Sequence, residues 1–289
     1  MSFVYLDHNI YIYSLTDQRI ADAVEEMKKR GICFVYSPAH IEEIYKARIE
    51  QGVSYHETMK SLIKLISTFT DNTEFLPSNT SIIIKNEHPD LCYKRVFSKD
   101  TTERIKNDSW IKYEVDRQNY REMIEADKHL QSISTIPPDK LWEHEVFKAA
   151  LIELNQSMRE IVLKNNNSID TLVCACWGAD KTLPVDLQIE EGAFPKLRKS
   201  HTQLEFVMEI LFRMLNFYGY YTDKSASKAV SGTHDITHAI YATASDYFCT
   251  ADYRFSQRCK AVYYYLGIPT EVITCEKETV SAELTKIIM

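Results

Sequence analysis

Short apolar runs, each about as long as one buried strand, occur near both ends of the chain and are followed by carboxylates. Residues 3–6 lead directly into Asp7, and residues 247–250 lead to Asp252. Buried parallel strands read as such continuous apolar runs, and ligands bind in the crevice beyond their carboxyl ends. We therefore expect one parallel sheet assembled from both ends of the chain, with the two acids facing the same crevice.

Helix signals alternate with strand signals in the first part of the sequence. Thr16 is a candidate cap for a helix that runs to Arg30 and stops at Gly31, and residues 32–36 read as the next strand, which completes a βαβ unit. The other expected elements are a helix that begins at Ser37-Pro38 and ends near Gly52, a helix opened by a capping box at Ser54 and Glu57 and ending near Thr70, and a short strand at residues 74–76.

The alternation returns in the last part of the sequence, after a long helical middle. Residues 86–220 carry helical periodicity, clearest at 101–130, 139–165 and 203–219, and we expect a helical insertion there. The expected C-terminal elements are a helix at 234–244, a strand at 247–250, a helix at 252–266, a strand at 271–275, and a last helix with Glu276 near its start. The predicted organisation is therefore 1–85 and 221–289 as two parts of one α/β domain, with 86–220 inserted between them.

Composition indicates a soluble protein of the cytoplasm. The 289 residues are 45% hydrophobic, and no apolar run approaches the roughly 20 residues that cross a bilayer. The seven cysteines are an odd number without a Cys-x-x-Cys pair, which favours buried free thiols; Cys174-Ala175-Cys176 is better explained by core packing than by redox chemistry. The net charge of −7 gives no general attraction for phosphates, so nucleic-acid binding would need a local basic patch, such as Lys181 or Lys196–Lys199, or a bridging metal.

Four acids stand at four junctions between a strand and a helix. They are Asp7, Glu43, Asp235 and Asp252, with Glu42 as an adjacent alternative to Glu43. Each acid taken alone has an ordinary explanation as a helix cap or as a charge near the positive end of a helix. Carboxylates that share a site raise one another's pKa, so four together imply a cation, and oxygen donors suit Mg²⁺ or Mn²⁺. Two such ions could activate water and stabilise the leaving oxygen in phosphodiester hydrolysis.

These four positions resemble the PIN-like domain nuclease family (PIN superfamily). Asp7-His8-Asn9 is similar to the first acidic motif of that family, and Glu43, six residues after Ser37, is similar to the second. Asp235, which opens an alanine-containing helix with His238, resembles the third, and Thr250-Ala251-Asp252 resembles the fourth. The resemblance covers residues 1–77 and 232–289.

The resemblance implies a PIN-like parallel sheet flanked by helices and a metal-dependent endonuclease. Asp7, Glu43, Asp235 and Asp252 would bind Mg²⁺ or Mn²⁺, and Asn9, Thr250 and His238 would be supporting polar groups. The implied substrate is RNA, with DNA left open, and a toxin or defence effector is a plausible setting. The helical insertion would be the place for a homodimer contact or an inhibitory protein partner.

Three alternatives stay open at this point. The dipeptide His234-Asp235 also occurs in HD-type phosphohydrolases, which need further histidine ligands. His234 and His238 could form a zinc pair, although no clear third ligand follows from the sequence. A noncatalytic PIN-like adaptor, which binds a protein or RNA partner, is the alternative from another functional class.

Overall fold

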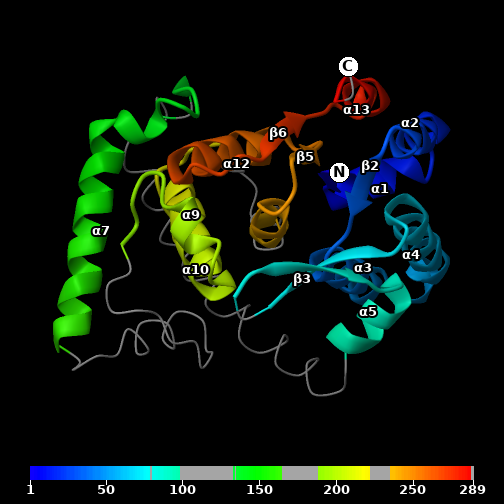
Figure 1. Ribbon diagram of the computed structural model, residues 1–289, viewed down its shortest axis with the longest axis horizontal. Helices are drawn as coiled ribbons and strands as arrows, with labels where there is room; N and C mark the ends of the chain where they lie inside the picture. Colours follow the sequence, from blue (N-terminus) through cyan, green and yellow to red (C-terminus); the bar gives the residue numbers. More distant parts are fainter. Residues whose placement is uncertain (79, 98–132, 134, 165–187, 222–234, 288–289) are drawn as a thin grey trace.

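The computed structural model describes residues 1–78, 80–97, 133, 135–164, 188–221 and 235–287 (Figure 1). At its centre is a four-stranded parallel sheet with the order β2-β1-β5-β6. The strands are β1 (Ser2–Leu6), β2 (Ile32–Val35), β5 (Tyr247–Thr250) and β6 (Glu271–Thr274). Strand β1 pairs with β5, so the two ends of the chain share one sheet, as the sequence predicts.

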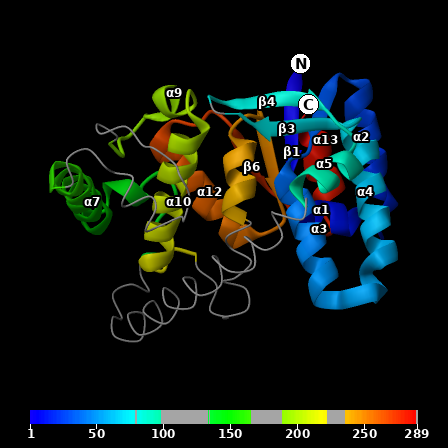
Figure 2. The same cartoon turned by 90° about the horizontal axis from the view of Figure 1, so that it is seen from below.

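The two faces of the sheet are covered by two different hydrophobic clusters. Successive side chains of a strand point to opposite faces, so Tyr5 and Phe248 join one cluster while Leu6 and Cys249 join the other. Figure 2 shows the sheet between the two groups of helices. This three-layer arrangement explains why the strands are apolar on both faces rather than alternating.

The N-terminal helices cover the Leu6 face of the sheet. They are α1 (His8–Ser14), α2 (Gln18–Lys29), α3 (Pro38–Gln51) and α4 (His56–Thr70), with the 3₁₀ turn η1 (Gly52–Tyr55) between the last two. Two local expectations are wrong. The cap of α2 is Asp17 rather than Thr16, and the Ser54 hydroxyl donates to the Gln51 carbonyl instead of forming a capping box. Helix α1 was not expected, and it begins directly after Asp7.

A two-stranded antiparallel sheet follows α4. It consists of β3 (Thr73–Pro77), which was predicted, and β4 (Ile82–Asn86), which was not, and it is followed by α5 (Pro89–Val96). A parallel bridge between Tyr36 and Glu74 places β3 beside the end of β2. The apolar run at residues 82–84 is the sequence signal for β4, and its Ile83 and Ile84 are exposed.

The middle of the chain is helical where the structure describes it. Its elements are the 3₁₀ turn η3 (Leu141–Glu143), α7 (Glu145–Lys164), α9 (Phe194–Leu197) and α10 (His201–Phe217). Apolar residues of η3, α7 and α10 belong to the same cluster as Tyr5 and Phe248. The indole of Trp142 also donates to the Ala261 carbonyl at 2.7 Å. The expected helix at 101–130 lies outside the described residues, as do Cys174, Cys176 and Lys181.

The C-terminal elements complete the sheet and its Tyr5 face. A helix covers residues 235–242, β5 follows it, and α12 (Tyr253–Leu266) ends at Gly267, whose φ of 70° suits a glycine at a helix end. Strand β6 and α13 (Val280–Lys286) come last, and α13 lies on the Leu6 face. Within the described ranges, no helix combines the length and apolar character needed to cross a membrane.

Replacement of Phe34 by alanine should destabilise the protein by about 3–5 kcal/mol, because it removes a buried aromatic side chain and leaves a cavity between β2 and its helices. Phe34 is 1% exposed, whereas Phe217 is 50% exposed and provides a matched control. Urea unfolding of Phe34→Ala and Phe217→Ala measures the two costs. Equal losses would contradict the assignment of Phe34 to the core.

Candidate functional site

Asp7 lies at the carboxyl end of β1, at the point where β1 and β5 are joined. Its backbone N–H donates to the Cys249 carbonyl at 2.8 Å, which continues the parallel pairing by one residue beyond β1. One carboxylate oxygen accepts from the His8 N–H at 2.8 Å and caps α1, and the other accepts from the Thr250 hydroxyl at 2.7 Å. The residue is 3% exposed. Strand pairing and helix capping therefore fix the position of this carboxylate.

Thr250 connects two of the predicted acids. Besides donating to Asp7, its hydroxyl oxygen accepts from the Asp252 backbone N–H at 3.2 Å. The Asp252 side chain caps α12 by accepting from the Phe255 N–H at 2.9 Å. The two acids that follow the apolar runs thus lie at neighbouring strand ends, and a single buried threonine contacts both residues.

Glu43 lies between two buried histidines. One oxygen of Glu43, Oε2, is 3.6 Å from Nδ1 of His8 and 3.6 Å from Nε2 of His238. Neither of these imidazole nitrogens has a hydrogen-bond partner within the usual distance. Glu43 is on the second turn of α3, as expected from its spacing after Ser37.

The neighbouring Glu42 is influenced by His238 and by Glu43 itself. Burial raises the pKa of Glu42 to about 7; His238 opposes this effect, and Glu43 and Glu205 raise the pKa further. The charge of Glu43, and not that of Glu42, is among the causes that raise the pKa of Asp7 and of Asp235. Glu43 is therefore the glutamate that shares an environment with the aspartates.

A hydrogen-bond network beneath Glu43 holds the histidines in place. The Tyr5 hydroxyl is 2.7 Å from Nδ1 of His238 and 2.6 Å from the Ser37 hydroxyl. His40 accepts the Ser37 N–H at Nδ1, so its Nε2, 2.8 Å from the Leu6 carbonyl, is the donor. The rings of His40 and His238 meet edge to face at 4.6 Å between centroids. This network joins β1, α3 and the helix at 235–242 from three distant parts of the sequence.

Asp235 is the first described residue of the helix at 235–242. Burial raises the pKa of Asp235 well above its usual value; Asp7, Glu43 and Asp252 raise it further, and Arg258 opposes them. The charges of the other three predicted acids therefore reach Asp235. Arg258, on α12, is 5% exposed and donates to the Asn216 side chain at 2.8 Å.

The pKa values of His8 and His238 are shifted in opposite directions. Burial lowers the pKa of His8, and Glu43 only partly offsets that effect. Burial also lowers the pKa of His238, but Glu43, Asp7 and Asp235 outweigh it, so the pKa of His238 is raised. The surrounding carboxylates thus favour the protonated form of the His238 imidazole.

The four acids are nevertheless spread more widely than the ligands of a bound ion. Over the described part of the chain, one group of three ligating side chains has its donor atoms within 4.8 Å of one another, and it is Glu74, Glu87 and Cys92. The oxygens of the four acids offer the hard donor set that Mg²⁺ and Mn²⁺ prefer.

The remaining predicted residues lie at the surface or outside the described part of the chain, and two residues of the site were not predicted. Asn9 is exposed on the first turn of α1, the basic residues Lys196, Arg198 and Lys199 are exposed around α9, and His234 lies outside the described residues. His40 and Arg258 were not predicted. Arg258 has a detectable signal, because it lies at a helical spacing from Phe255 and Val262 that places it on the buried face of α12.

Asp7 should make the metal-free protein less stable as the pH rises. Burial, with the charge of Glu43, raises the pKa of Asp7 from 3.8 to about 6. A raised pKa means that the folded state prefers the protonated acid, so stability falls as the pH rises from about 4 through about 6. Relative to Asp7→Asn, wild type should lose about 2 kcal/mol between pH 4 and pH 7.

Urea unfolding in a chelator at both pH values tests this expectation. Asp22→Asn, a change at an exposed aspartate of α2, is the control and should follow wild type at both pH values. If Asp7→Asn also follows wild type, folding does not raise the pKa of Asp7 and the proposed environment is wrong.

Comparison of the chain with models of known protein families, with curated proteins and with solved structures found no match in any of the three.

Proposed function

We propose that the protein is a metal-dependent endonuclease with a PIN-like domain, and that RNA is its substrate. The observation that supports this proposal most is the shared electrostatic environment of Asp7, Glu43, Asp235 and Asp252 at the carboxyl ends of parallel strands. Crevices at this edge of open parallel sheets are where ligands bind. The residues come from both ends of the chain, so a role confined to local helix capping does not explain their convergence.

The requirement for a cation follows from the charges. Asp7 is buried, and its unfavourable environment is only partly relieved by His238, Thr250 and the His8 N–H. Arg258 opposes the effect of the other acids on Asp235 but does not cancel it. A divalent cation would neutralise several carboxylates at once and draw them together. It would also attract phosphate, which the net charge of −7 does not.

The side chains of the site have separable roles in this proposal. Asp7, Glu43, Asp235 and Asp252 would hold Mg²⁺ or Mn²⁺, which when bound would activate water and stabilise the leaving oxygen. Thr250 fixes the orientation of Asp7 by donating to it. Tyr5 and Ser37 fix His238 beside Glu43, where the imidazole limits the positions that the carboxylate can take.

The biological setting belongs to the same proposal. A cytoplasmic nuclease of this kind would need its activity restrained, as in toxin or defence systems. The helices at 86–220 would be an insertion that offers a contact for a second copy or for an inhibitory protein.

Asp7→Asn and Asp235→Asn should each lower Mn²⁺-dependent or Mg²⁺-dependent cleavage of RNA by at least about 100-fold, because each removes a charge from the metal-binding group. Asp22→Asn should keep wild-type activity. The measurement is the initial rate of cleavage of total RNA and of a single-stranded DNA, with and without chelator, which also decides between the two substrates.

Two results would contradict the nuclease proposal in different ways. Wild-type protein that binds neither ion, by calorimetry, would remove the metal site. Wild-type protein that binds an ion but cleaves neither nucleic acid would instead support the noncatalytic adaptor.

Glu43→Gln should weaken Mn²⁺ binding by at least about 10-fold, whereas Glu42→Gln should change it little, because Glu43 is the glutamate that shares its environment with Asp7 and Asp235. The two variants are neighbours with the same chemical change, so each controls for the other. Calorimetric titration with Mn²⁺ measures both. The opposite order of effects would assign the ligand to Glu42.

A further inference from the structure

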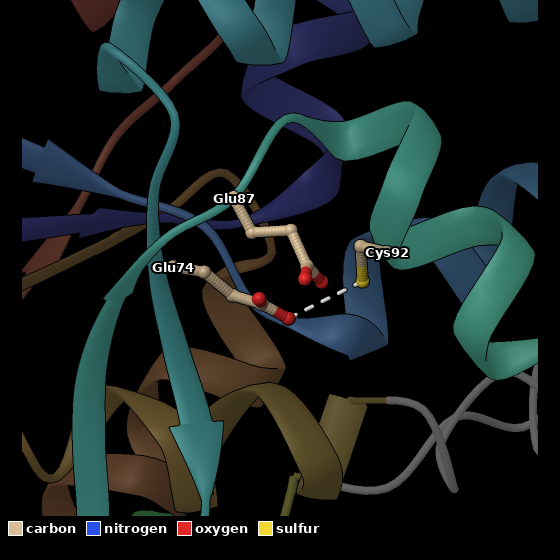
Figure 3. A group of neighbouring side chains, drawn as sticks. All are labelled: Glu74, Glu87 and Cys92. Atoms are coloured by element: carbon tan, nitrogen blue, oxygen red, sulfur yellow. Dashed lines mark hydrogen bonds between the residues drawn. The ribbon is translucent and has the colours of Figure 1, made fainter.

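A second group of ligating side chains lies outside the candidate functional site, between β3 and α5. Glu74 is on β3, Glu87 is in the connection between β4 and α5, and Cys92 is on α5 (Figure 3). Their ligand atoms all lie within 4.8 Å of one another. Figure 3 shows the two carboxyl groups and the sulfur pointing toward a common space.

The existing contacts of this group leave one buried oxygen without a partner. The Glu74 side chain is 0% exposed; its Oε1 accepts from the Cys92 thiol at 3.3 Å and from Arg95. Its other oxygen, Oε2, is buried and has no hydrogen-bond partner. Glu87 accepts from Lys85 at one oxygen and from the Arg95 Nε at 3.0 Å at the other.

Arg95 is the group that a metal ion would have to displace. Its side chain is 37% exposed, whereas those of Glu74 and Glu87 are 0% and 11% exposed. The guanidinium can therefore move toward solvent while the carboxylates stay in place. Arg95 carries a single positive charge beside the two glutamates. A divalent ion would neutralise both carboxylates more fully and would also bind Oε2 of Glu74, which has no partner.

We propose that Glu74, Glu87 and Cys92 form a structural site for a single Zn²⁺ ion. The donors would be the Cys92 sulfur, one oxygen of Glu87 and both oxygens of Glu74, a mixed sulfur and oxygen set that suits zinc and not Mg²⁺. When the Zn–S bond forms, the thiol loses its proton to the buffer and Arg95 releases Glu74. No electron transfer is involved.

The position of this site gives it a structural consequence. The Tyr36 hydroxyl donates to the Glu87 carbonyl at 2.6 Å, and Tyr36 immediately precedes Ser37, the cap of α3. A bound ion would fasten β3, the connection after β4 and α5 to one another, next to the start of the helix that carries Glu43. The proposal does not depend on the nuclease assignment, because its donors are different residues and its metal is different.

Titration of the full chain with Co²⁺, followed by displacement with Zn²⁺, tests the proposal. Bound Co²⁺ should produce the near-ultraviolet absorption of a thiolate–cobalt bond, with the intensity of one such bond per chain. The band should disappear in Cys92→Ser and remain in Cys33→Ser, in the double variant Cys174→Ser/Cys176→Ser, and in Asp7→Asn. Absence of the band in wild type, or its persistence in Cys92→Ser, overturns the proposal.

Two further variants distinguish a zinc site from an ion-pair network. Arg95→Gln removes the competing cation and should raise the affinity for Zn²⁺ at least 10-fold, measured by competition with a chromogenic chelator. A network without a metal role predicts no gain, and that result overturns the proposal. Zn²⁺ at about 100 times its Kd should raise the Tm of wild type by about 5 °C and leave Glu87→Gln unchanged, which provides a test if Cys92→Ser does not fold. Equal shifts in both proteins also count against the site.

Discussion

The parallel pairing of β1 with β5 is the interaction on which the rest of the structure depends. It aligns Leu6 with Cys249, and the hydrogen bond from the Asp7 N–H to the Cys249 carbonyl extends that register to the end of the strand. This register brings the Thr250 hydroxyl within hydrogen-bonding distance of the Asp7 carboxylate, although the two residues are 243 positions apart in the sequence. A shift of one residue would turn Thr250 to the opposite face and separate the two groups.

The same pairing concentrates negative charge in a buried region. Asp7 and Asp235 both have raised pKa values, because burial and neighbouring acids disfavour their charged forms. His238 and Arg258 reduce the repulsion without removing it. Such a group of carboxylates lowers the stability of the metal-free protein. In the function that we propose, the same charges would bind the cation.

The sequence predicted most of the sheet and less of its surroundings. The apolar runs of β1, β2, β5 and β6 are continuous because both faces of the sheet are covered, and this pattern is readable directly. Strand β4 was missed although residues 82–84 form an apolar run; the run is only three residues long, and Ile83 and Ile84 are exposed on a two-stranded sheet. Helix α1 was missed because it is short and its cap, Asp7, was considered mainly as a candidate ligand. The predicted cap of α2 was wrong by one residue, Thr16 instead of Asp17, because helix boundaries are difficult to place from sequence.

For the candidate site, the sequence by itself determined which acids stand at junctions between strands and helices, since apolar runs and capping patterns are local. Only the tertiary structure brings the charge of Glu43 within reach of Asp7 and Asp235, because that influence depends on how α3 packs against β1 and the helix at 235–242. It also decided that His40, Tyr5 and Ser37 form the network beneath Glu43, and that Glu74, Glu87 and Cys92 meet. These residues belong to separate elements, and only the packing of those elements determines their distances.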